Sequence, residues 1–281
     1  MSTLYAWAKP AFFSESPMDH TWVTDFDNRV HKYNNIVEVV ANGKNYWYSW
    51  GDYHILGLTP SLPDGLVCAE QGALSLATCL CKPNIASKAE LRARGTIYNY
   101  GIDGVCHQLT NQILAATTSK LIVSKVRGYI TSSFLFGDYG LEEDKFWNSK
   151  YSGCSTNPNS YRTDLTGHMG FISTKEVQMD RRIDTFELRA RAVLAGKANE
   201  RKLSKLLELR RTQRSHLTTL SENIDSKKVQ SLNADELNAK HNEFLAQALE
   251  ILGPNTFQTL FDIAPGTVVR LVDESQLATA S

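Results

Sequence analysis

The feature that most constrains the fold of this 281-residue chain is a change of composition near Lys175. From there to about Leu252 the sequence contains no proline and is rich in Ala, Leu, Glu, Lys and Arg. Asn233 is predicted to cap a helix that Gly253 and Pro254 end. The apolar residues that recur at helical spacing in this part are Phe186, Ala190, Val193, Leu194, Leu203, Leu206 and Leu207. We therefore expect long helices over residues 176–252.

The first part of the chain has strand and turn signals instead. Residues 20–26 alternate and are rich in β-formers, and residues 36–40 and 46–50 flank Asn42-Gly43, a strong hairpin signal. Residues 120–136 contain further β-rich runs, and residues 268–272 are predicted to return as a last short strand. The sequence thus predicts an α+β domain over residues 1–175 and a helical region over residues 176–281.

Composition and charge exclude several classes of protein. The 30 Lys and Arg balance the 30 Asp and Glu, which argues against a general nucleic-acid or anionic-membrane surface. No apolar run approaches the roughly 18 residues of a membrane span, and residues 1–9 lack the pattern of a signal peptide. The five cysteines are odd in number and irregularly spaced, as in a reducing compartment. Cytoplasmic synthesis is the expectation, and export by a signal-independent route is compatible with it.

The segment Gly101–Asn111 carries the strongest chemical signal. It reads as the end of a loop, with Asp103 as N-cap of a helix whose first turn contains Cys106. Free N–H groups and the positive end of the helix dipole favour a thiolate there. A buried, inert thiol is the alternative for Cys106, but the polar neighbours His107, Gln108 and Asn111 favour a nucleophile.

A nucleophilic cysteine needs a histidine as general base, and the chain has seven. His107 is poorly placed, because adjacent side chains on a helix diverge by about 100°. His216 and His241 lie on charged helical faces and are predicted to be solvated. His20, which opens a β-rich run, and His168, which follows a turn-rich loop, remain as candidates.

A cysteine at a helix N-terminus with a histidine on a strand resembles the papain-like superfamily, and specifically the NlpC/P60 group. In the ordinary order the cysteine helix precedes the histidine strand, which is similar to Cys106 followed by His168 in Gly167–Ile172. The order of His20, a hairpin and then Cys106 is similar to circularly permuted members such as the lecithin:retinol acyltransferase group. We favour the permuted order. The resemblance covers residues 1–175 only.

The resemblance implies a papain-like core, in which the cysteine helix packs on an antiparallel sheet. It implies attack by the thiolate on an amide, thioester or ester, and an acyl-enzyme released to water or to an acceptor. Asp25 is the nearest acid to orient the His20 imidazole, although its offset of five residues puts it on the opposite face of a regular strand. Asp52 and His54 are the alternatives for this role. The oxyanion would lie against the Cys106 N–H and the amide of Asn99, with Gln108 as the alternative.

The implied substrate is a peptide or a small amide or acyl compound, and hydrolysis and acyl transfer are not distinguished. Trp22, Trp47 and Trp50 lie near the expected site. Packing in the sheet is the favoured role for these aromatic side chains, and lining the substrate groove is the alternative.

No metal or cofactor is expected. Cys68, Cys79 and Cys81 do not have zinc-site spacing, because paired CxxC motifs are missing. The sequence has no GxxxxGK[ST] or GxGxxG phosphate loop and no GxSxG nucleophile elbow.

The many arginines and lysines of residues 176–252 are expected to form a solvated helix face balanced by Asp and Glu. An oligomerisation hairpin or a partner-docking arm is the alternative. The competing function for the whole chain is therefore a non-catalytic binding or assembly module that uses these helices.

Overall fold

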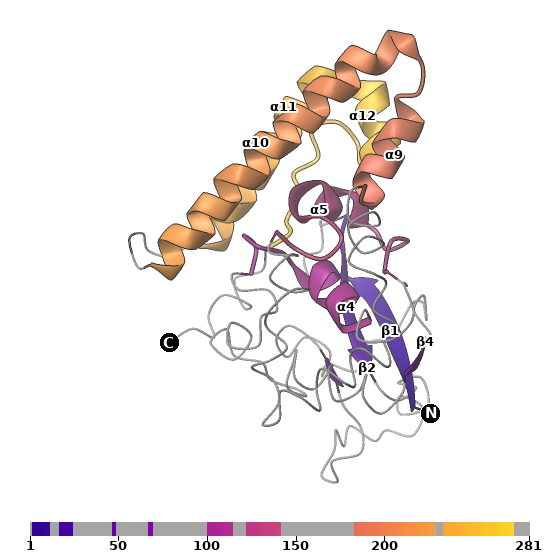
Figure 1. Cartoon of the computed structure of the whole chain (residues 1–281), viewed down its shortest axis with the longest axis vertical. Helices are drawn as coiled ribbons and strands as arrows, with labels where there is room; N and C mark the ends of the chain where they lie inside the picture. Colours follow the sequence, from indigo (N-terminus) through magenta and orange to yellow (C-terminus); the bar gives the residue numbers. More distant parts are fainter. Residues whose placement is uncertain are drawn as a thin grey trace, which may run out of the picture.

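The structure is a computed structural model that describes residues 2–11, 17–24, 47–48, 67–69, 100–114, 122–141, 183–226, 228 and 233–272. A small sheet and the helix that bears Cys106 lie at one end of the described molecule, and the long C-terminal helices lie at the other (Figure 1). A short buried helix stands between these two parts.

The sheet has four strands in the order β3-β2-β1-β4, and neighbouring strands are antiparallel. Its centre is the pair of β1 (Ser2–Pro10) and β2 (Asp19–Thr24), in register from Tyr5 opposite Thr24 to Pro10 opposite Asp19. The strand predicted to begin at His20 is therefore present. Of the predicted hairpin, only β3 (Trp47–Tyr48) is within the described residues, and β4 (Val67–Ala69) pairs with β1.

Helix α4 (Cys106–Leu114) packs on β2, and the Thr110 hydroxyl donates to Thr21 Oγ1 at 3.0 Å. The helix starts at Cys106, so the prediction that Asp103 is its N-cap is wrong. The Val105 N–H instead donates to Gln108 Oε1 at 3.1 Å. This bond is the half of a capping box in which the side chain of the third helical residue reaches back to the cap.

Helix α5 (Tyr129–Phe136) corrects the prediction of β structure over residues 120–136. All eight of its residues are buried, and Gly128 and Gly137, both at φ 76°, flank it. A Cβ on Gly128 would meet the Met18 sulfur at 1.6 Å, so this turn requires glycine. A helix that is buried on every side is stable only when other elements surround it.

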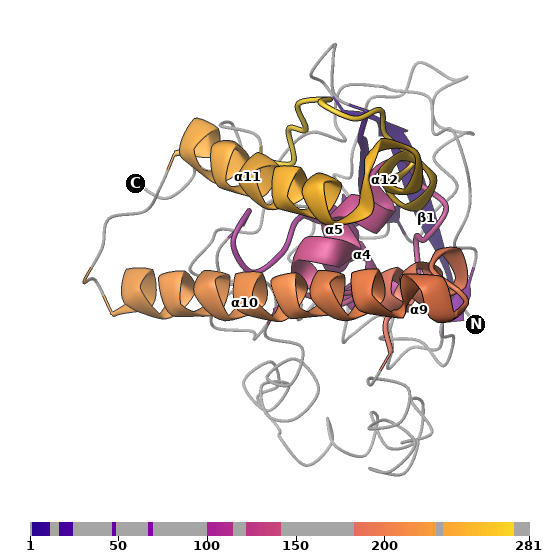
Figure 2. The same ribbon diagram turned by 90° about the horizontal axis from the view of Figure 1, so that it is seen from above.

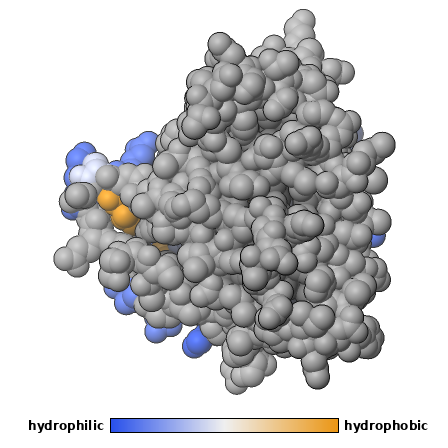
Figure 3. Space-filling view, turned by 90° about the horizontal axis from the view of Figure 1, so that it is seen from below, coloured by the Kyte–Doolittle hydropathy of each residue, from blue (hydrophilic) through white to orange (hydrophobic). Residues whose placement is uncertain are grey.

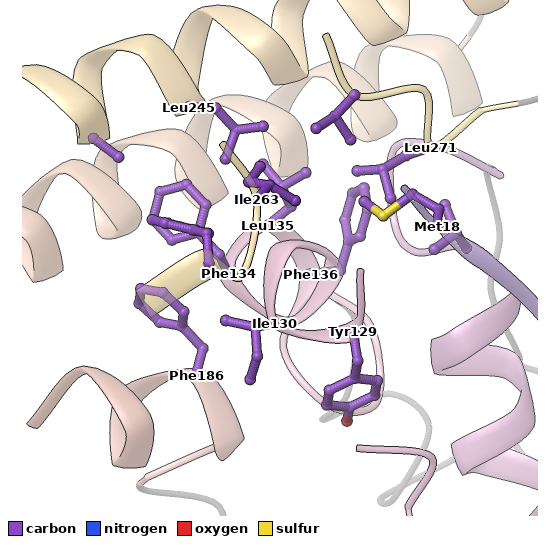
Figure 4. Close-up of a cluster of buried hydrophobic side chains, with 14 of the residues drawn as sticks. Met18, Tyr129, Ile130, Phe134, Leu135, Phe136, Phe186, Leu245, Ile263 and Leu271 are labelled. Atoms are coloured by element: carbon purple, nitrogen blue, oxygen red, sulfur yellow. The ribbon is translucent and has the colours of Figure 1, made fainter. Parts of the chain in front are cut away.

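The core forms around α5 (Figure 4). The Phe134 ring lies 4.9 Å from Phe186 and 5.3 Å from Phe261, measured between ring centroids. On the other side of α5, Phe136 and Leu271 lie near Met18 in the close-up. The helix thus joins the sheet end of the molecule to the C-terminal helices.

The C-terminal part consists of α9 (Thr185–Val193), the 3-10 helix η3 (Lys197–Asn199), α10 (Glu200–Asp225), α11 (Ala234–Leu252) and α12 (Pro254–Phe261). Helices α10 and α11 run side by side as a long hairpin in both views (Figures 1 and 2). The predicted cap at Asn233 is confirmed, and Glu236 completes a capping box with it.

Two carboxylates, the buried Asp138 and the partly buried Asp184, join α5 to the helices that follow. Asp138 accepts from the hydroxyls of Tyr129 and Ser133 and from the backbone and side chain of Thr185. Asp184 caps α9 and pairs with Arg210 of α10. The Arg210 guanidinium also donates to the carbonyls of two residues near the end of α5, Ser133 and Phe134, at 2.7 and 2.9 Å. Asp138 and Arg210 are buried, and each has the hydrogen-bond partners that burial of charge requires.

The last described residues, 267–272, form neither helix nor strand, and side chains of α11 bind the backbone of residues 269–272 where a strand was predicted. Asn238 receives the N–H groups of Leu271 and Val272 on Oδ1 and donates to the Val272 carbonyl at 2.8 Å. Asn242 makes the same kind of pair with Val269, at 2.8 and 2.7 Å. One turn of helix separates the two asparagines, so both amides lie along one face of α11.

The predicted boundary at residue 175 lies outside the described residues, so the division into two domains stays a prediction. Within the described ranges, buried side chains from both parts belong to one hydrophobic cluster. Tyr100, Val105 and Phe136 share that cluster with Phe186, Leu237 and others from the C-terminal helices.

Candidate functional site

Cys106 is the first residue of α4 and lies against β2. It is a free cysteine with 7% of its surface exposed. The residues before it, 100–105, are all buried and form the turn we call the Cys106 loop. The thiol therefore lies where α4, the sheet and the Cys106 loop meet.

The electrostatics of Cys106 oppose the prediction of a thiolate. Burial raises the pKa of the thiol from 9.0 to about 11, because a charged sulfur would lose its hydration. Hydrogen bonding with the backbone and hydroxyl of Thr21, and with the backbone of His107 and Cys106, acts in the opposite direction but is weaker. The thiol is protonated at neutral pH in this conformation, although four hydrogen-bonding groups that favour an anion surround it.

His20 is the second residue of β2, and the residue that contacts Cys106 is its neighbour, Thr21. The His20 ring stacks on Trp22, with ring centroids 5.7 Å apart. Because successive side chains of a strand point to opposite faces, His20 and Trp22 lie on the face of the sheet away from α4. The described conformation does not bring the predicted base to the sulfur.

His107 is directed at a different partner, as the helical spacing predicts. Its Nε2 lies 2.8 Å from the Asp19 carbonyl, which can only accept, so Nε2 carries the proton. Its Nδ1 lies 2.8 Å from Ser132 Oγ. Burial lowers the pKa of His107 from 6.5 to about 4, an effect that Asp19 partly offsets. The ring is a neutral bridge between β2 and α5.

Gln108 is also engaged in holding the fold. Its amide nitrogen donates to the Gly137 carbonyl at 2.9 Å and to Ser132 Oγ at 3.4 Å, and its Oε1 receives the Val105 N–H. Both N–H groups of this amide are therefore directed at α5 and its end. They do not point toward Cys106, the position that an oxyanion donor would require.

The structure describes only some of the remaining predicted site residues. Trp22 is 1% exposed, which fits packing within the sheet. Trp47 is a residue of β3, of which only the backbone is described. Four of the predicted side chains lie outside the described residues: Asp25, Asn99, His168 and Trp50.

Thr21 is the residue of this site that the sequence-based reasoning missed. It is 1% exposed and lies between Cys106 and Thr110 of α4. The signal was available in the alternation of residues 20–24, where a strand that directs His20 to one face must direct Thr21 to the other.

In the described ranges, no three His, Cys, Asp or Glu side chains are placed to hold a metal ion. No described helix combines the length and apolar character needed to cross a membrane. The large hydrophobic side chains exposed on the described surface are Ile183, Leu188 and Val268. Figure 3 shows the molecule from below. On this face, the described residues are mostly hydrophilic, and they include a small hydrophobic area.

Comparison with protein-family models, with curated proteins and with solved structures finds no match for this chain. The resemblance to the papain-like superfamily therefore stays a prediction. The argument for function rests on the Cys106 site itself.

Proposed function

We propose that this protein is a cysteine-dependent hydrolase or acyltransferase with Cys106 as its nucleophile. The observation that carries the proposal is the set of hydrogen-bonding groups around the sulfur. The helix N-terminus contributes the backbone of Cys106 and His107, and β2 contributes the backbone and hydroxyl of Thr21. Groups that hydrogen-bond to the sulfur lower the free-energy cost of forming the thiolate, which is the nucleophilic form of cysteine.

The chemistry is acyl transfer through a thioester. A base removes the Cys106 proton, the sulfur forms a bond to the substrate carbonyl carbon, and the bond from that carbon to nitrogen, oxygen or sulfur breaks as the proton passes to the leaving group. Water or an acceptor amine or alcohol then releases the acyl group. Two histidines are candidates for the base: His20 would have to move from the far face of β2, and His168 lies outside the described residues. Movement that hydrates Cys106 would also lower the pKa of its thiol from about 11 toward 9.0.

The test is trapping of the acyl-enzyme. Wild-type protein is incubated with a panel of thioesters, activated esters and amides, and its intact mass is measured after rapid acid quench. We expect an adduct in the wild type and in Cys68→Ala, and none in Cys106→Ala. An adduct that survives Cys106→Ala, or an adduct-free wild type across the panel, removes the proposal.

The base is assigned by the same measurement. His20→Ala and His168→Ala are compared with wild type for the rate at which the adduct forms. Loss of general base catalysis costs about 10²- to 10⁴-fold. The histidine whose replacement causes such a loss is the base, and equal rates in both variants and the wild type exclude both histidines.

A second function is favoured by one observation, the burial that holds the pKa of Cys106 at about 11. A thiol that is never released from this environment would be structural, and the chain would be a binding or assembly module. This alternative predicts no adduct in the trapping experiment. It also predicts a stable oligomer by light scattering, formed through the C-terminal helices.

A further inference from the structure

We infer that Asn238 of α11 is a positioning residue for Cys106, which acts by holding Leu271 and Val272 against the start of the Cys106 loop. The inference rests on the proposed function, since it concerns the same thiol. It assigns the C-terminal helices a role in building the site rather than in docking a partner.

The first step is the contact between the C-terminal segment, residues 269–272, and the loop. The Tyr100 hydroxyl donates to the Leu271 carbonyl at 3.4 Å. Gly101 has φ 81°, and a Cβ there would lie 2.5 Å from Val272 Cγ2 and 3.2 Å from Leu237 Cδ1. The first two residues of the loop are thus packed directly on the segment and on α11.

The second step is how that contact reaches Cys106. The Gly101 N–H donates to the Gly104 carbonyl at 2.8 Å, which closes the turn two residues before Cys106. Asp103, within this turn, receives the Ser221 hydroxyl of α10 at 2.9 Å. The place where α4 begins, and with it the environment of the sulfur, is therefore set by the C-terminal helices.

The third step identifies Asn238 as the residue that holds the segment. It is buried, and three hydrogen bonds of 2.8–3.0 Å join its amide to the backbone of residues 271 and 272. Asn242 binds Val269, farther from the loop. Removing the Asn238 amide therefore leaves three buried backbone groups unpaired, at the point where the segment contacts Gly101.

The test measures the pH profile of Cys106 alkylation by iodoacetamide in the full chain, by mass spectrometry of the Cys106 peptide. In Asn238→Ala we expect the loop to loosen and the apparent pKa of the thiol to move from about 11 toward 9.0. Complete hydration would raise the thiolate fraction at pH 8 by about 100-fold. Asn238→Asp keeps the acceptor oxygen and should give a smaller change.

Asn233→Ala is the matched control, because it removes the cap of the same helix without touching the segment. An alkylation profile in Asn238→Ala that equals that of Asn233→Ala overturns the inference. Should Asn238→Ala not fold, the comparison of Asn238→Asp with Asn233→Ala decides in the same way. Alkylation does not need catalysis. If the profile shifts but no acyl-enzyme is trapped, the proposed function is rejected and the inference about Asn238 stands. If an acyl-enzyme is trapped but the profile does not shift, the proposed function stands and the inference is rejected.

Discussion

Acid should unfold this protein because two buried histidines, His107 and His241, are neutral in the folded chain. Burial lowers the pKa of each ring from 6.5 to about 4. For His241 the Gly101 backbone acts in the opposite direction and is the weaker effect. Between these pKa values the unfolded chain binds a proton that the folded chain does not. The free energy of unfolding is therefore highest above pH 6.5 and falls as the pH falls toward 4.

The size of this loss follows from the two pKa values of each ring. At roughly 1.4 kcal/mol for each unit of pKa, one histidine removes roughly 2 kcal/mol of the free energy of unfolding between pH 7 and pH 5. Two such rings remove roughly 4 kcal/mol, against a total of about 5–15 kcal/mol for a typical protein. The two histidines can therefore dominate the acid limb of the stability profile.

The assay is urea unfolding followed by circular dichroism at pH 7, 6 and 5. His241 packs edge-on against Phe136, so His241→Leu replaces the ring with an apolar side chain. We expect this variant to lose only about half as much stability as the wild type between pH 7 and pH 5. His216→Leu, which changes an exposed residue of α10, controls for the loss of a histidine as such. A pH dependence in His241→Leu that equals the wild-type dependence would falsify this reasoning.

Three further changes test the packing around α5 and the Cys106 loop by urea unfolding. Arg210→Met removes the closest cation from Asp184 and the donors to two α5 carbonyls, and should cost about 2–3 kcal/mol, with part of the loss recovered when Asp184→Asn is added. Gly101→Ala should cost about 3 kcal/mol from left-handed strain and overpacking, whereas Gly266→Ala, with open space around it, should cost about 1 kcal/mol; equal costs would contradict the close approach. Asp138→Asn should cost about 2 kcal/mol, since one amide cannot accept from all four donors; a neutral result would contradict that network.

The sequence predicted best where local signals decide the structure. The cap at Asn233 and the buried positions Phe186, Ala190 and Leu206 follow from residue type and helical period, and the structure confirms them. His241 is an exception, because it was predicted to be solvated and is fully buried. Its ring lies against Phe136, a contact between elements far apart in the sequence.

Helix α5 was missed for a physical reason. Tyr129–Phe136 contains aromatic and β-branched residues on every side, so no period of 3.6 distinguishes a helix from a strand. This segment is a helix because α9, α10 and α12 pack around it. Packing between distant elements cannot be read from a local sequence pattern.

Some features of the candidate site could be predicted from the sequence and others could not. A helix with Cys106 in its first turn and the strand at His20 could be predicted, since both have local signals, although the helix does not begin after Asp103. The protonation of the thiol could not, because it depends on how much water the surrounding elements exclude. The position of His20 relative to Cys106 depends on which face of β2 the helix covers.

The bond between Tyr100 and Leu271 has a consequence for how the protein is made. The two residues are 171 positions apart, so the ribosome adds Leu271 long after the Cys106 loop has emerged. At about 5–20 residues per second, the loop waits on the order of ten seconds or more for the segment that holds it. During this interval Cys106 lacks its native surroundings and is open to oxidation. Nascent chains should therefore be the form most easily damaged at this thiol.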